Sequence, residues 1–130
     1  PMFAGDRSAV NTMKQANDLA EMINSDSLGV AVDVYHTWWD DSLQSEISRS
    51  AATGRLLAFH ICDWNVPTTD MLNDRGLMGD GCIDIPLIRS WMEDSGFTGF
   101  HEVEIFSNKF WSLDQKEYLY KIINAYLNHS

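Results

Sequence analysis

The sequence has 130 residues, of which 45% are hydrophobic and 12% aromatic, and its formal net charge is −10. This length supports one packed domain, and the apolar content excludes a disordered chain. The negative charge argues against a nucleic-acid or anionic-membrane partner, because either would repel the chain.

Neither a membrane-spanning nor a disulfide-rich protein fits this sequence. No apolar run approaches the roughly 18–20 residues of a membrane span. The two cysteines, Cys62 and Cys82, stand in unrelated contexts. We therefore expect free thiols and a reducing, cytoplasmic compartment.

Helical and strand patterns alternate through the first half of the chain. Residues 8–24 carry apolar side chains at helical spacing, with Asp6 or Ser8 as the predicted cap. Residues 28–35 (LGVAVDVY) form a β-branched run that is typical of a buried strand. Two further elements follow, a short helix and a second buried strand, over residues 41–50 and 56–62 (LLAFHIC).

The second half opens with a long loop. No periodicity runs through residues 63–81, and a loop of this length in a compact domain usually carries function. Asp84 is the predicted cap of a helix that Gly96 ends. The remaining elements are a third strand and a last helix with a capping box, predicted at residues 100–106 (FHEVEIF) and from Ser112 and Gln115.

The alternation of helices with continuous apolar strands indicates an α/β fold built of parallel β/α units. We expect residues 1–130 to form a single domain. Three parallel strands would leave two unpaired edges, so further strands or a second copy of the chain must cover them.

A polar side chain stands at the end of each predicted strand: Asp33, His60 and Glu104. Taken singly, these residues also fit a helix cap, a hydrogen-bonded core histidine and a partner of an arginine. The carboxyl ends of parallel strands converge, however, and buried carboxylates are costly unless they are paired or bind a metal. Together they predict a site for Mn²⁺, Mg²⁺, Co²⁺ or Zn²⁺.

Six residues near these strand ends are candidates for substrate contact: His36, Trp38, Trp39, Asp63, Arg75 and Glu102. An arginine fork can hold a phosphate or paired hydroxyls, and a surface ion pair with Asp74 or Asp80 explains Arg75 equally well. The tryptophan pair favours either core packing or a wall for the C–H face of a sugar. Glu102 shares the strand face of Glu104, because strand side chains alternate.

Four segments, taken in order, resemble the sugar phosphate isomerase/epimerase family of xylose isomerase-like TIM barrels, which includes D-tagatose 3-epimerase and inosose dehydratase relatives. They are DVYHTWW from Asp33, HICDW from His60, the run from Asp74-Arg75-Gly76 to Ile83-Asp84, and the stretch from Gly96-Phe97-Thr98-Gly99 to Glu104. The resemblance extends over nearly the whole chain. It implies the C-terminal portion of a (β/α)₈ barrel, about strands six to eight, with the N-terminal strands absent.

The resemblance also assigns roles to residues. Asp33 and His60 match metal ligands, and Glu104 matches a last-strand glutamate that is both a ligand and a catalytic acid/base. His36 and Arg75 match residues that bind substrate. Glu102 has no fixed role in the family, so it stays a candidate either for contact with the substrate or for support of a metal ligand. The family's fourth ligand, a glutamate at the end of the fifth strand, has no match in this chain.

The resemblance thus implies a metal-dependent sugar or sugar phosphate isomerase or epimerase that transfers a proton through an ene-diolate, with this chain as an incomplete part of the enzyme. One alternative is an inosose-type dehydratase on the same barrel. Another is a non-catalytic half-barrel that self-associates. The expected partners are a small sugar or sugar phosphate and either a second copy or the N-terminal half of the barrel.

Overall fold

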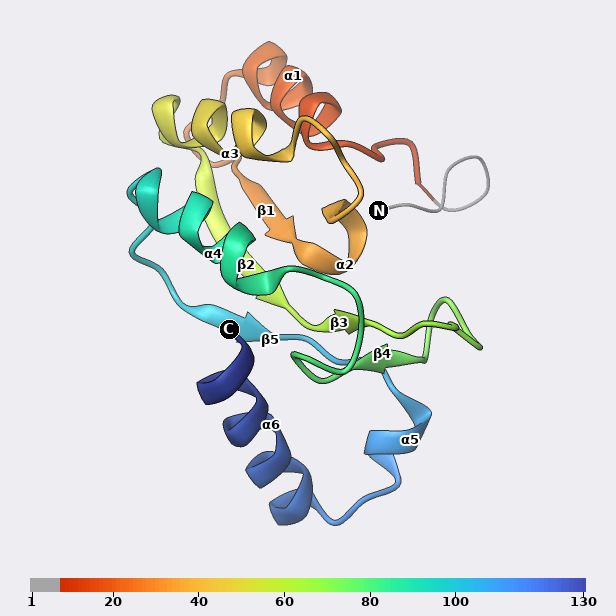
Figure 1. The fold of residues 1–130 in the computed structure, drawn as a ribbon. Coiled ribbons are helices and arrows are strands. Elements are labelled where there is room, and N and C mark those ends of the chain that lie inside the picture. The colour runs from red at the N-terminus through yellow and green to blue at the C-terminus, as the bar shows by residue number, and fades with distance from the viewer. Residues whose placement is uncertain (1–7) are drawn as a thin grey trace.

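A three-stranded parallel sheet forms the centre of the computed structural model, which describes residues 8–130 (Figure 1). Its strands are β1 (Val30–Asp33), β2 (Leu56–Ile61) and β5 (His101–Val103), in the spatial order β1-β2-β5. Both neighbouring pairs are parallel. The predicted α/β class and the three predicted strands are therefore confirmed, although each strand is shorter than its apolar run.

Three helices, α1 (Met13–Ile23), α3 (Leu43–Ala52) and α4 (Ile85–Asp94), lie along one side of this sheet (Figure 1). Phe59 and Ile61 of β2 are fully buried in one core with apolar residues of these helices, including Ile47 and Met92. The alternation of side chains along β2 leaves His60 on the opposite face. One face of the sheet is thus the core, and the other carries the polar residues.

The start of α1 differs from the prediction. Thr12 caps this helix and forms a capping box with Gln15. Ser8 does not cap it, because its hydroxyl donates a hydrogen bond to the carbonyl of Val10. The alternative cap, Asp6, lies outside the described residues.

The later helix boundaries are predicted in part. Asp84 accepts a hydrogen bond from the Leu87 amide and caps α4, as expected. Helix α6 (Gln115–His129) is capped by Asp114. The predicted cap Ser112 instead ends α5 (Asn108–Trp111), a one-turn helix that the apolar pattern does not indicate.

The long loop contains secondary structure of its own. Strands β3 (Asp63–Trp64) and β4 (Arg75–Gly76) pair antiparallel within it. A second short element, α2 (Val34–Thr37), follows directly on β1, and the Asp33 side chain caps it by accepting from the Tyr35 amide. The helix-cap reading of Asp33 is therefore correct, and it leaves the second carboxylate oxygen of this residue for other contacts.

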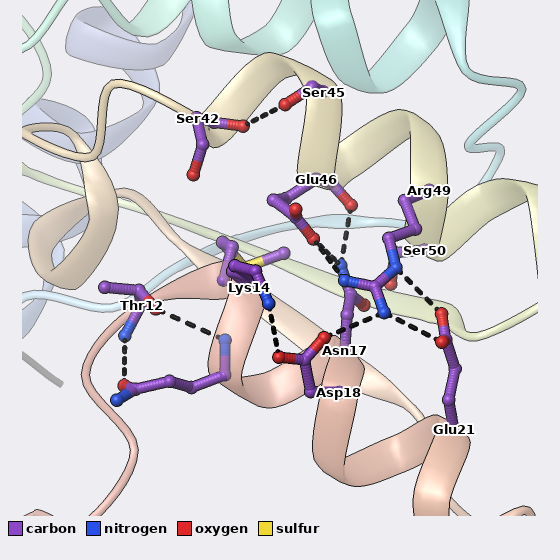
Figure 2. A network of polar contacts seen from close by, with 12 residues as sticks. Thr12, Lys14, Asn17, Asp18, Glu21, Ser42, Ser45, Glu46, Arg49 and Ser50 are labelled. Atoms are coloured by element: carbon purple, nitrogen blue, oxygen red, sulfur yellow. Dashed lines mark hydrogen bonds and ion pairs between the residues drawn. The ribbon is translucent and has the colours of Figure 1, made fainter.

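A network of charged groups joins α1 to α3 (Figure 2). Arg49 of α3 forms ion pairs with Asp18 and Glu21 of α1 and with Glu46 of its own helix. The buried amide of Asn17 donates to the backbone and to the side chain of the same Glu46. A single surface ion pair contributes little, but a shared network fixes the relative position of two helices.

The described part of the sheet ends at β1 on one side and at β5 on the other, so it does not close into a barrel. None of the helices in this part of the chain combines the length and apolarity needed to cross a membrane.

We predict that Phe59→Ala lowers the free energy of unfolding by about 3–5 kcal/mol, because a fully buried aromatic side chain is replaced by a cavity. Leu57 lies on the same strand, at the register shift between β1 and β2, and is 62% exposed. Leu57→Ala should therefore change the free energy by no more than about 0.5 kcal/mol. Urea denaturation of the two variants checks this, and equal losses would contradict the assignment of the core.

Candidate functional site

The strand register brings polar side chains into one row across the sheet. Asp33 pairs with His60, and His60 pairs with Glu102, so these three residues lie side by side on neighbouring strands. Glu104 follows one alternation later, beyond the end of β5, and its amide still donates to the Ile61 carbonyl. The parallel sheet therefore gathers three carboxylates and one imidazole at its C-terminal edge.

Asp33, His60 and Glu104 form a group in which one ligand atom from each residue lies within 4.8 Å of the other two. The distance from His60 Nδ1 to Glu104 Oε2 is 3.9 Å. Ligand atoms around an ion with bonds of about 2.0–2.2 Å are roughly 3–4 Å apart, so a small closing movement would form a coordination shell. Two carboxylates and an imidazole suit a divalent metal ion. The fold thus brings together the three predicted ligands.

Arg75 lies against the same carboxylates. Its side chain is almost fully buried, with Nη1 at 2.8 Å from Glu104 Oε2 and 3.6 Å from Asp33 Oδ2. The guanidinium stacks on two rings, 4.3 Å from the centroid of Tyr35 and 4.9 Å from that of Phe106. The surface alternative, an ion pair with Asp74 or Asp80, does not describe this arginine. Its positive charge offsets the repulsion between the two acidic residues.

The Tyr35 and Phe106 rings were not predicted as part of the site. Tyr35 stands between Asp33 and His36 in the sequence, and Phe106 stands two residues after Glu104. Aromatic residues next to strand-end carboxylates were a signal for such a cation–π contact, but only the structure shows which cation they hold.

His36 is neutral at physiological pH. Burial, followed by the positive charge of Arg75, lowers the pKa of His36 from 6.5 to about 4. Its Nε2 lies 3.3 Å from Arg75 Nη2, and an arginine can only donate, so Nε2 is the acceptor of this contact. The structure therefore brings His36 and Arg75 together at the edge of the carboxylate group.

Asp63 has a different environment from the one predicted. Its side chain is buried, and its two oxygens accept hydrogen bonds from four backbone amides, those of Trp64, Gly79, Gly81 and Ile83. The Asp63 carboxylate is buried and accepts from these four amides, so it is not accessible to a substrate. Its contacts hold the end of the long loop against β3, and β3 in turn pairs with the strand that carries Arg75.

The two tryptophans lie in unlike environments. Trp38 is half-buried and packs against Trp64, with 6.3 Å between the ring centroids, whereas Trp39 is exposed. Core packing therefore accounts for Trp38. The wall for a sugar ring stays a prediction, and Trp39 is the residue with a free face for it.

Two of the cavities lined by described residues bear on the location of the site. One of about 120 Å³ adjoins Asp33 and His36 and extends to the start of α1. A larger one, of about 390 Å³, lies between the loop after β4 and helices α5 and α6, away from the carboxylate group. We locate the candidate site by its converging side chains, because chemistry requires these and volume alone does not supply them.

The sequence model of the family described as "Xylose isomerase-like TIM barrel" matches residues 1–122. Curated relatives include the inosose isomerases of Bacillus licheniformis and Halalkalibacterium halodurans, which are 27% and 26% identical over 110 residues. Each alignment covers 83% of this chain and 39% of the relative. The chain thus spans about two-fifths of the length of these relatives.

Two solved structures share the fold. Protein SMc04130 from Sinorhizobium meliloti 1021 is 49% identical with a TM-score of 0.93, over 98% of this chain and 46% of that chain. The IolI protein, in a structure with a bound zinc atom, is 23% identical with a TM-score of 0.77, over 92% of this chain and 43% of that chain. These matches confirm the predicted architecture, a portion of a TIM barrel.

We predict that Asp63→Asn lowers the free energy of unfolding by about 2–4 kcal/mol, because a buried amide group cannot accept from all the amides that the carboxylate serves. Hydrogen exchange should speed up at Gly79, Gly81 and Ile83. Asp70→Asn, at the exposed tip of the same loop, should leave exchange at these three amides unchanged. Unchanged exchange in Asp63→Asn would show that the loop is held by other contacts.

The low pKa of His36 predicts a pH dependence of stability. Between pH 6.5 and 4 the unfolded chain takes up a proton at His36 and the folded chain does not. The stabilisation from the neutral imidazole is therefore complete above pH 6.5 and is lost as the pH falls toward 4. Between pH 6.5 and 4, the melting temperature of the wild type should fall more steeply with decreasing pH than that of His36→Gln. Equal slopes of melting temperature against pH would contradict this prediction.

Proposed function

The chain belongs to the xylose isomerase-like TIM-barrel family, and from this premise we propose that it forms the catalytic edge of a metal-dependent sugar or sugar phosphate isomerase or epimerase. The observation that carries the proposal is the convergence of Asp33, His60 and Glu104 at the C-terminal edge of three parallel strands. In TIM barrels this edge is the face where catalytic residues gather.

Asp33, His60 and Glu104 would hold the metal. A divalent ion bound there would stabilise the negative charge that develops on substrate oxygens. The bound zinc of the IolI structure supports a divalent ion. The oxygen-rich ligand set is also compatible with Mn²⁺, Mg²⁺ and Co²⁺.

Glu104 is the proposed acid/base. Its carboxylate takes a proton from the carbon next to a carbonyl, and the electron pair of that C–H bond moves toward the carbonyl oxygen to give an ene-diolate. Return of the proton to the former carbonyl carbon, with transfer of the neighbouring hydroxyl proton to the former carbonyl oxygen, completes an isomerisation. Return to the opposite face of the same carbon completes an epimerisation, and it requires a second carboxylate, which we assign to a barrel strand beyond those described here.

His36 and Arg75 would orient the substrate. Arg75 is a fixed donor, since its guanidinium is stacked on two rings. The neutral His36 can accept from a hydroxyl or donate to one without adding charge. Holding substrate oxygens in this way lowers the entropic part of the barrier.

The relatives favour a polyol ketone as the substrate. Two of them are inosose isomerases, which supports isomerisation over loss of water. The dehydratase reading uses the same proton abstraction and differs only in the loss of a hydroxyl from the next carbon. We therefore propose isomerisation in the cytoplasm, in a barrel completed by further β/α units or by a second copy.

To test this function, we suggest joining the chain to the remaining barrel portion of the Sinorhizobium meliloti relative and assaying inosose and a panel of ketoses with Mn²⁺. Glu104→Gln should lower kcat by at least about 100-fold, because a general base is removed. Removal of the metal with a chelator should also abolish turnover. Glu93→Gln, on the exposed side of α4, is the matched control and should retain activity. Full activity of the Glu104→Gln chimera would overturn the proposal.

A further inference from the structure

His60 lies between two glutamates, one facing each nitrogen of its ring. Nδ1 is 3.9 Å from Glu104 Oε2, and Nε2 is 3.9 Å from Glu102 Oε2. Glu102 belongs to β5, and Glu104 follows two residues later, just beyond the end of this strand. Strand alternation places both side chains on the same side. The imidazole therefore has one nitrogen directed at the candidate metal ligands and the other directed at a residue outside that group.

Glu102 is the direct neighbour of His60 across the sheet. Their Cα atoms are register partners in the parallel pair β2–β5. The Glu102 side chain is 59% exposed, against 37% for Glu104, so it is free to rotate toward the ring. A hydrogen bond to Nε2 would require the side chain to close the present separation of 3.9 Å.

A neutral imidazole carries one N–H and one lone pair, and a hydrogen bond at one nitrogen decides which nitrogen has the lone pair. Histidines that bind metals commonly donate their second N–H to a carboxylate, which fixes the tautomer and the ring orientation. Here a proton on Nε2, held by Glu102, leaves the lone pair on Nδ1, on the side of Asp33 and Glu104.

We infer that Glu102 is a positioning residue that orients His60 for metal binding through its Nε2–H. This inference rests on the proposed metal-dependent function. Of the two roles that the sequence leaves open for Glu102, it favours support of a metal ligand over contact with the substrate. It also explains why a third carboxylate stands beside the site although it lies outside the group of converging ligand atoms.

The first measurement is Zn²⁺ affinity by isothermal titration calorimetry on the purified chain. Glu102→Ala should raise the Kd for Zn²⁺ by about 10–100-fold, the usual effect of removing such a partner. Glu102→Gln keeps an acceptor oxygen and should recover most of the affinity. Asp94→Ala removes one exposed charge from α4 and should leave the Kd unchanged, which controls for net charge.

The second measurement is the tautomer of His60 in the metal-free chain, from the ¹⁵N shifts of histidine-labelled protein. His60→Gln identifies the His60 signals among those of the four histidines. The wild type should populate the Nε2–H form, and Glu102→Ala should shift the ring toward a mixture of both forms. A residue that merely supports the fold would not change this ratio.

The outcomes separate this inference from the proposed function. Unchanged Zn²⁺ affinity with an unchanged tautomer in Glu102→Ala overturns the positioning role and leaves the metal site standing. A raised KM in the chimera with unchanged Zn²⁺ affinity also overturns it, in favour of substrate contact. A loss in Glu102→Gln as large as in Glu104→Gln makes Glu102 a ligand. Failure of the wild type to bind Zn²⁺, with a tautomer that still depends on Glu102, counts against the proposed function alone.

Discussion

Two carboxylates, Asp33 and Glu104, meet at one edge of the parallel sheet, and both lie within reach of the buried guanidinium of Arg75. Like charges this close repel each other strongly in a partly buried setting. Arg75 offsets the repulsion, and the rings of Tyr35 and Phe106 hold it in place. The same arginine also sets the conditions for a metal, because an ion that binds Glu104 must share this carboxylate with Arg75 or displace it.

The position of Arg75 depends on the long loop, and the order of that loop depends on Asp63. A loop of this length would normally sample many conformations, at a cost in conformational entropy when it is fixed. The buried carboxylate of Asp63 gathers backbone amides from the loop's far end, and the short β3–β4 pair fixes its near end. The amide of Gly81 must come so close to β3 that an added Cβ would overlap the Trp64 carbonyl. The Asp63 carboxylate therefore both orders the loop and holds Arg75 at the candidate site.

The two faces of the sheet differ, because helices cover one of them and not the other. Helices α1, α3 and α4 cover the apolar face of the sheet, whereas the polar face carries the candidate site. Parallel sheets are normally covered on both faces. Helix α6 also keeps part of its apolar surface exposed, at Leu119, Tyr120, Ile123 and Leu127. This asymmetry fits a portion of a barrel, in which the polar face lines the interior and neighbouring β/α units cover the edges.

The sequence by itself determined the α/β class, the three strands and the residues that converge at their ends, because alternation and strand parity depend only on local pattern. It also indicated Asp84 as a cap. It did not distinguish Thr12 from Ser8, or Asp114 from Ser112, because several residues near each helix start could cap it and backbone geometry selects among them. Only the tertiary structure decided that Asp63 holds the loop, that Arg75 faces inward, and that Glu102 lies beside His60. Each of these depends on the register and on contacts between residues far apart in sequence, which local patterns do not encode.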